Sequence, residues 1–195
     1  MAELGRVVVY TAPTVEPVTL AEAKLHLRVS HLSDDQLIAR LIGAAREFVE
    51  AHTGLFTTTA TVDVYFDAAP ASSFELPVSP VASITSITTY DTTGTGTTMT
   101  GTDYSLDAAS VPARVVLKDT ASWPSGLRSW NAVVVRAVVG STSAAAVPAR
   151  LRQAVLLLVG ELYERREQSS EKALSVVPLS VMRLLAQLRR LAGLA

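Results

Sequence analysis

The sequence predicts an α+β protein, a helical bundle formed by N-terminal and C-terminal helices with an inserted small antiparallel β domain. Two observations carry this prediction. Apolar residues recur at helical spacing near both ends of the chain, whereas the middle is rich in Thr and Val and alternates apolar with polar residues. The predicted segments are an extended arm (1–16), a helical hairpin of the bundle (17–54), the inserted β domain (55–140) and the C-terminal helices that complete the bundle (141–195).

The arm and the hairpin have distinct local patterns. Residues 6–10 are β-prone, and Pro13 and Pro17 oppose a helix around them, so we expect an extended arm or an edge strand. Two helix starts follow, because Thr19 with Glu22 and Ser33 with Gln36 have the spacing of a capping box. An apolar stripe of helical period then runs from residue 37 to 49, and Gly54 fits the residue that ends such a helix.

The middle of the chain predicts strands. Apolar and polar residues alternate within 56–66 and 81–90, and shorter β-prone runs lie at 104–106, 113–117 and 132–139, the last of which is apolar enough to be central. The Thr-rich residues 91–102 predict a turn and an exposed hairpin tip. We assign Trp130 to packing of the β domain. Trp123 lies in a Pro- and Gly-containing loop, where it either packs or anchors an interface.

The C-terminal region predicts two helices, and the first of them, residues 148–168, organises the fold. Pro148 fits a first helical turn, where its missing N–H needs no partner. The helix is apolar nearly all round in its middle but far shorter than the ~20 residues that span a bilayer. We therefore expect a core helix that other helices cover, from this chain or from another copy. A last helix covers 178–190, with Leu and Arg on its two faces.

The composition narrows the function classes. The 195 residues are 49% hydrophobic, contain no cysteine and carry a net charge of −1. A disulfide scaffold, a cysteine nucleophile and the usual structural zinc sites are therefore excluded, and no global charge favours nucleic acid or an anionic membrane. The chain from Pro148 onward is nonetheless basic, which suits either a second partner at that end or ordinary helix-surface charge. The N-terminus lacks the pattern of a signal peptide, so we expect assembly inside the cell.

The search for catalytic motifs is negative. The three histidines lack ligand spacing, so we expect no metal site, and Gly94 and Gly96 are not followed by the helix that a phosphate site needs. The acidic pairs 34/35 and 103/107 fit a helix start and local turns, and the serines lie outside nucleophile motifs. We expect no enzyme and no cofactor. A helix-turn-helix DNA-binding regulator stays open, although Arg40 and Arg46 are few basic groups for a recognition helix.

Three groups of motifs, taken in order, carry a family resemblance. They are PVTLAEAKLHLR at 17–28 with the residues up to Gly54, LPVSPVASITSI at 76–87, and Val147-Pro148 followed by LYERRE at 162–167. Together these resemble the head–tail connector (adaptor) proteins of long-tailed bacteriophages and gene transfer agents. The Thr-rich tip at 92–102 departs from the family pattern.

The resemblance implies a structural virion protein at the head–tail interface, assembled in the host cytoplasm. Such proteins form a homo-oligomeric ring, typically dodecameric, beneath the portal protein, although an isolated chain can be monomeric. The ring extends the DNA channel, through which DNA passes without sequence-specific binding, and docks the next connector, a stopper or a tail protein. No membrane is involved. A stopper or tail-completion protein is the alternative, but such proteins tend to be small β-barrels.

The resemblance also implies candidate interface residues. The C-terminal segment of the family commonly reaches the portal, which gives Arg183, Leu184, Leu188, Arg189 and Arg190 as candidate portal-binding residues. Candidate subunit-interface residues are Trp123, Arg165 and Arg166.

Overall fold

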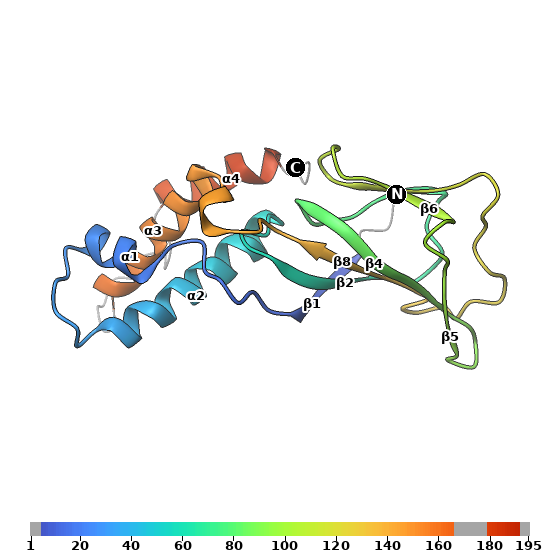
Figure 1. Ribbon diagram of the computed structural model, residues 1–195, viewed down its shortest axis with the longest axis horizontal. Coiled ribbons are helices and arrows are strands. Elements are labelled where there is room, and N and C mark those ends of the chain that lie inside the picture. The colour runs from blue at the N-terminus through green and yellow to red at the C-terminus, as the bar shows by residue number, and fades with distance from the viewer. Residues whose placement is uncertain (1–4, 166–178, 192–195) are drawn as a thin grey trace.

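The computed structural model describes residues 5–165 and 179–191, and within them it confirms a mixed α+β protein with four α-helices and two antiparallel sheets. The helices lie at one end of an elongated molecule and the sheets at the other (Figure 1). The helices are α1 (Leu20–Leu27), α2 (Asp35–Thr53), α3 (Ala149–Glu164) and α4 (Leu179–Leu191), with a short 3₁₀ turn, η1 (Ala144–Ala146), before α3.

The larger sheet joins strands that are far apart in the sequence. Its order is β1-β2-β8-β4-β5, formed by β1 (Arg6–Thr11), β2 (Ala60–Phe66), β8 (Val133–Val139), β4 (Val81–Tyr90) and β5 (Gly96–Thr98). The apolar run at 132–139 is the central strand, as predicted, and the arm is the edge strand β1. The Thr-rich tip forms the β4–β5 hairpin.

Part of the β region forms a second, smaller antiparallel sheet. It has the order β3-β7-β6, formed by β3 (Ser73–Glu75), β7 (Arg114–Leu117) and β6 (Tyr104–Asp107). The three residues of β3 are too few to show alternation, so the sequence pattern gave no sign of them. Phe74 packs edge-on against Phe66 of the larger sheet, with ring centroids 5.3 Å apart, and joins the two sheets in one core.

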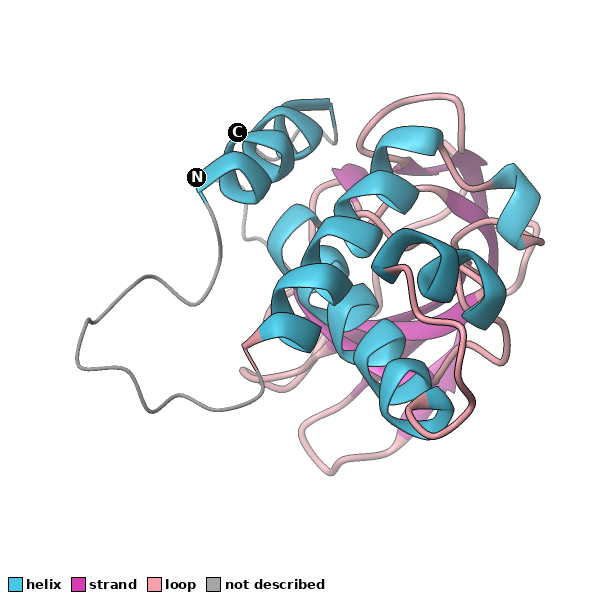
Figure 2. Cartoon of the chain, turned by 90° about the vertical axis from the view of Figure 1, so that its left-hand side faces the viewer, coloured by secondary structure: helices cyan, strands magenta, loops and turns pink. Residues whose placement is uncertain are grey.

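The helices share one separate core. α2 packs along α3, and α1 and α4 each contact both of them. Figure 2 shows the helices gathered in front of the strands. The stripe predicted on α3 is buried at Leu151, Val155 and Leu158, and α4 adds Val181 and Leu185 to the same cluster. Helices of the same chain therefore cover much of the core helix. No helix among the described residues is long and apolar enough to cross a membrane.

The structure confirms some of the predicted helix ends and contradicts others. The Thr19–Glu22 capping box is present, and Gly54 ends α2 in the left-handed region. The box predicted at Ser33 is wrong, because the Ser33 hydroxyl lies 2.7 Å from Nδ1 of His31 and α2 starts after Asp34. The Asp34 carboxylate instead accepts a hydrogen bond from the Tyr163 hydroxyl of α3. Pro148 lies one residue before α3, rather than in its first turn.

Gly140 directly follows the central strand β8, at the point where the chain returns to the helices and passes the segment that leads into β2. Its φ is +85°, and a Cβ built there would lie 2.1 Å from the carbonyl oxygen of Thr58. The neighbouring Ser141 accepts a hydrogen bond from the Thr59 hydroxyl at 2.9 Å. Only glycine therefore allows the two connections between helices and sheet to pass this closely.

We predict that Gly140→Ala lowers the free energy of unfolding by at least about 3 kcal/mol, through backbone strain together with the clash on Thr58. The matched control is Gly94→Ala, where φ is +87° and nothing lies within 4 Å of the added Cβ. This variant should lose only about 1–2 kcal/mol. Urea unfolding measures both, and equal losses would show that the close approach does not matter.

Glu22 gives a prediction about acid stability. The backbone and side-chain hydrogen bonds from Thr19, helped by the charge of Arg152, lower the pKa of Glu22 from its usual 4.5. A lowered folded-state pKa stabilises the fold above the unfolded-state value, and this stabilisation is lost as the pH falls through the folded-state value. Glu22→Gln keeps the capping-box pattern without the charge. The wild type should therefore lose its advantage over this variant below about pH 4.5 in pH-dependent urea unfolding, and a constant difference would contradict the assignment.

Candidate subunit interface

The edge strand β1 exposes apolar side chains on both of its faces, between Arg6 at its start and a register irregularity at Val9–Thr11. Among the described residues β1 pairs only with β2, so its other edge is open. Val8, Val9 and Tyr10 are 41%, 49% and 61% exposed. Proteins usually protect such edges with lysine, proline or inward-pointing charges, and the residues from Val7 to Tyr10 include none of these. An edge of this kind is suited to pairing with another chain.

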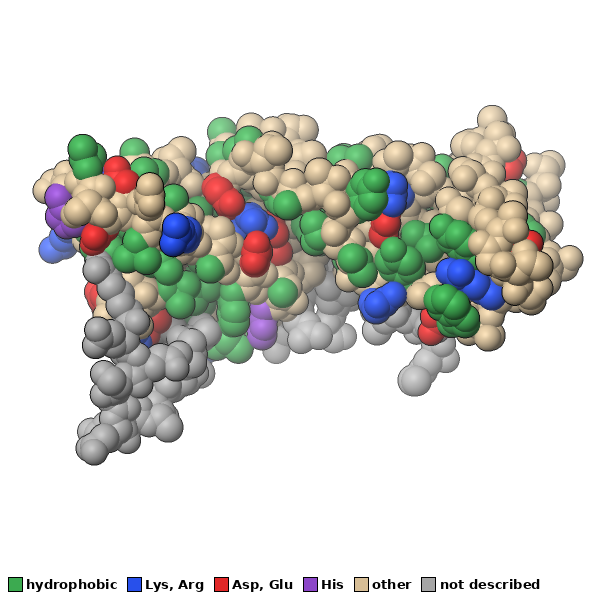
Figure 3. Space-filling view, turned by 90° about the horizontal axis from the view of Figure 1, so that it is seen from below, with side chains coloured by type: hydrophobic (Ala, Val, Ile, Leu, Met, Phe, Trp, Pro, Cys, Tyr) green, Lys and Arg blue, Asp and Glu red, His purple; other side chains and the backbone are tan. Residues whose placement is uncertain are grey.

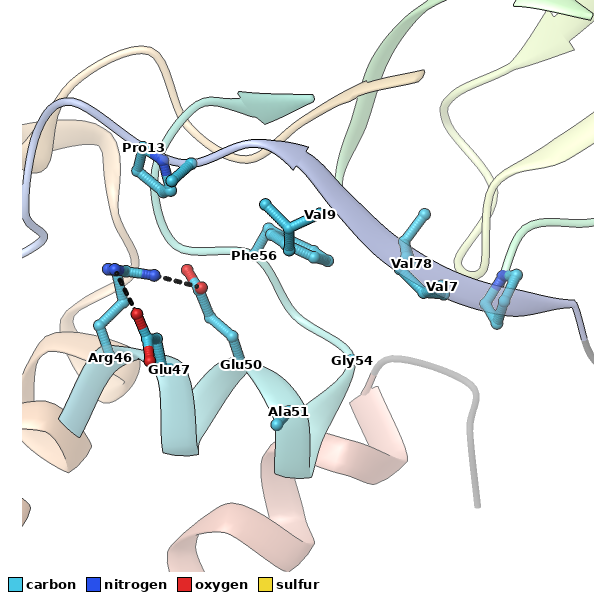
Figure 4. A pocket seen from close by; sticks show the side chains of 12 residues that line it. Val7, Val9, Pro13, Arg46, Glu47, Glu50, Ala51, Gly54, Phe56 and Val78 are labelled. Carbon is cyan, nitrogen blue, oxygen red and sulfur yellow. Dashed lines mark hydrogen bonds and ion pairs between the residues drawn. The ribbon is translucent and has the colours of Figure 1, made fainter. Parts of the chain in front are cut away.

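A groove of about 640 Å³ lies between the inner face of β1 and the C-terminal half of α2 (Figure 4). Val7 and Val9 of β1 form one wall, and Ala51 of α2 is on the other. Phe56 and Val78 also line the groove, so most of its surface is apolar. Such a groove beside an open edge strand offers both main-chain pairing and side-chain pockets.

A buried ionic cluster closes one end of this groove. Nε of Arg46 donates to Glu16 at 2.9 Å and Nη1 donates to Glu50 at 3.0 Å. The second oxygen of Glu50 accepts from the backbone N–H of Thr57 at 2.8 Å and from its hydroxyl at 2.7 Å. Burial opposes the charge of Arg46, but the hydrogen bond to Glu16 and the charges of Glu50 and Glu16 raise the pKa of Arg46 above its usual range. The cluster joins the arm, α2 and the segment before β2.

The outer face of the larger sheet carries arginines stacked on aromatic rings. Arg136 forms a two-pronged ion pair with the buried Asp63, with distances of 2.7 and 2.8 Å, and its guanidinium carbon lies 3.5 Å from the ring centroid of Tyr10. The hydrogen bond to Asp63 is the main cause that raises the pKa of Arg136 above its usual range. Arg6 similarly lies 5.0 Å from the ring centroid of Tyr65.

The assignment of Trp130 to core packing is wrong, because its side chain is 60% exposed. Arg128 lies between the rings of Tyr90 and Trp130, 4.3 Å from each centroid, and donates to the carbonyl of Asn131. Asn131 has a positive φ of 45° just before β8, in the tight loop that carries Trp130. Apolar and basic side chains accordingly neighbour one another over the β part of the face in Figure 3. Trp, Tyr and Arg are the residues most enriched at binding hot spots.

The three candidate subunit-interface residues from the sequence analysis lie in different parts of the chain. Trp123 is half-buried against the core, with its ring centroid 6.0 Å from that of Phe74. Arg165 ends α3 and pairs with Glu161 at 2.5 Å, and Arg166 lies outside the described residues. Neither Trp123 nor Arg165 lines the groove beside β1. Sequence reasoning missed the β1 edge, although an uncharged Val-Val-Val-Tyr run in a predicted edge strand was the available signal.

The candidate portal-binding residues belong to α4. Arg183 is exposed and Leu184 is half-buried, whereas Val181 and Leu185 face the shared helical core. Leu188, Arg189 and Arg190 continue the helix, but their side chains lie outside the described part. α4 therefore covers the core with one side and presents Arg183 on the other. In the described part of the chain, no group of three or more His, Cys, Asp or Glu side chains could hold a metal ion.

The sequence matches one protein family, and the fold resembles that of proteins in solved structures. The family of phage gp6-like head-tail connector proteins matches residues 17–113. The chain resembles a protein in the virion of a native gene transfer agent (GTA) particle, with a TM-score of 0.74, 23% identity and 94% of each chain covered. It also resembles a protein in the neck of the native particle computed with C12 symmetry, with a TM-score of 0.70 and 24% identity over 96% of this chain and 95% of that one. No curated protein matches the sequence.

We predict that Arg46→Leu lowers the free energy of unfolding by about 3 kcal/mol, because it leaves the buried Glu50 carboxylate without its charged partner. Arg40→Leu is the matched control on the exposed side of the same helix and should change stability by less than about 0.5 kcal/mol. Thermal unfolding followed by circular dichroism measures both variants. Similar midpoints for the two would contradict a stabilising role of the cluster.

Proposed function

We propose that this chain, which belongs to the family of gp6-like head–tail connector proteins, forms a ring beneath the portal protein of a virion and extends its DNA channel. The observation that carries the proposal is the family match from residue 17 to 113, which runs from just before α1 to the start of the β7 region. The fold likeness over nearly the whole chain to proteins of GTA particles supports it.

A ring of identical copies agrees with the open surfaces of the fold. The similar neck structures were computed with C6 and C12 symmetry, and we take twelve as the copy number here. A ring closed by rotation uses two different surfaces on each copy, one for each neighbour. The β1 edge with its groove supplies one such surface, and Trp123, Arg165 and Arg166 remain candidates for further subunit contacts.

The two ends of the ring would meet different partners. We assign the portal to the outward side of α4, where Arg183 is exposed and Leu184, Leu188, Arg189 and Arg190 lie close in sequence. The opposite end would dock a stopper or a tail protein, and DNA would pass through the channel without sequence-specific contacts. The role is structural and needs no catalysis. As part of this proposal the helices act as a bundle with the β region inserted between them, since both ends of the chain contribute to one helical core.

The structure weakens the alternative of a helix-turn-helix DNA-binding regulator. Of the two basic residues on the second helix, Arg46 is buried in the ionic cluster, and only Arg40 faces solvent. A helix that reads the major groove needs several basic or amide side chains toward the bases. The helical core likewise disfavours the small β-barrel expected of a stopper.

The proposed function is tested by deleting the gene in the strain that makes the particles. We expect portal-bearing, DNA-filled heads without tails by electron microscopy, and complementation should restore a ring with a central hole below the portal. Particles that keep a complete neck without this chain would overturn the proposal.

For the portal contact we predict that Arg183→Glu weakens co-sedimentation with portal rings by at least about fivefold, because a ring repeats the lost contact in every copy. Arg40→Glu is the control with the same charge change on another helix. Unchanged binding of the Arg183 variant would place the portal contact on another surface.

A further inference from the structure

We propose that the groove beneath β1 receives the α1–α2 turn of a second copy of this chain, meaning residues 25–34, from the last turn of α1 to the residue before α2. This inference rests on the proposed ring and names one of its contacts. The groove fits an apolar partner, since Val7, Val9, Phe56 and Val78 line it. Its volume of about 640 Å³ falls in the range of pockets that enclose whole ligands, about 300–1,000 Å³. Glu47, which is 73% exposed and pairs with Arg46 at 3.4 Å, also lines the groove, and with Glu50 the lining carries two carboxylates against the one arginine.

The α1–α2 turn presents the complementary chemistry. Leu25 and Leu32 are 81% and 78% exposed, more than the other large hydrophobic residues that the structure describes as exposed. Arg28 lies between them in the sequence, is exposed, and ends α1 in the left-handed region with φ 58°. The nearby Asp35 is paired with Lys24 at 2.5 Å. Leu25 and Leu32, which flank Arg28 in the sequence, can therefore contact the apolar lining of the groove, while Arg28 can pair with the exposed carboxylate of Glu47.

Within one copy this turn lies at the far end of the helical part, whereas β1 lies at the centre of the molecule (Figure 1). The turn therefore cannot fill the groove of its own copy. Because the turn and the groove are different surfaces of one chain, each copy can donate to one neighbour and accept from the other. This is the heterologous contact that rotation closes into a ring.

The contact can be tested by cross-linking, since the chain contains no cysteine. Necks are purified from particles that carry both Val9→Cys and Leu25→Cys and are treated with a short bismaleimide. We expect a ladder of covalent multimers of this chain, because each copy would be linked to both neighbours. Either substitution alone should give no ladder, and neither should Leu25→Cys combined with Lys118→Cys on the exposed end of the smaller sheet.

Charge exchange tests the same contact in another way. Glu47→Arg and Arg28→Glu should each lower incorporation into necks by roughly two- to fivefold, and the two together should restore it. Glu75→Arg is the matched control, an exposed glutamate on β3, and should leave incorporation unchanged. Equal thermal midpoints for all variants would show that folding is intact.

The outcomes separate this inference from the proposed function. Necks that contain the chain but give no ladder, give a ladder with the Lys118 control pair instead, or show no rescue by charge exchange would overturn the α1–α2 contact and leave the connector role standing. Necks that are complete without the chain would overturn the connector role itself.

Discussion

The buried ionic cluster of Arg46, Glu50 and Glu16 is the interaction on which the arrangement of the two halves depends. The helices and the sheets have separate apolar cores, and apolar packing alone fixes an angle between two such bodies poorly. The cluster supplies direction, because Arg46 reaches the arm while Glu50 accepts from both the backbone N–H and the hydroxyl of Thr57. Burying these charges is costly unless each is paired, so the paired geometry disfavours other orientations. The close passage of Gly140 over Thr58 strengthens the same junction from the other side.

The junction between the helices and the sheets anchors β1 while leaving one edge of the strand open. The strand is held at the sheet by β2, and the arm beyond it is tied to α2 by the ion pair of Glu16 with Arg46, so both are anchored before a partner binds. Its inner face lines the groove, and on its outer face Tyr10 covers Arg136, which in turn is fixed by Asp63. A surface that is held rigid before it binds loses little entropy on binding. An exposed apolar edge, which would be a liability in a monomer, thus becomes useful in a protein that assembles with copies of itself.

Periodicity in the sequence predicted the class of the fold and most elements, because long stripes such as the one on α3 and the apolar run of β8 depend on local pattern alone. It failed where a side chain had a partner other than the one that its motif predicts. Ser33 has the spacing of a capping residue, yet its hydroxyl contacts His31 and Asp34 is engaged with Tyr163, 129 positions away. The assignment of Trp130 to core packing failed as well, because its partner is the guanidinium of Arg128. The groove combines residues from β1, α2 and the segment 77–78, and no local pattern could have brought these together.

The order of strands in the larger sheet has a consequence for synthesis. β8 lies between β2 and β4, and α4, near the end of the chain, adds Val181 and Leu185 to the helical core. A nascent chain therefore cannot complete either half until β8 and then α4 have left the ribosome. Until β8 has emerged, β2 has only β1 as a neighbour in the sheet, and until α4 has emerged the helical core lacks Val181 and Leu185. Both cores of the protein are therefore completed late in synthesis, by segments that follow the whole of the groove in the sequence.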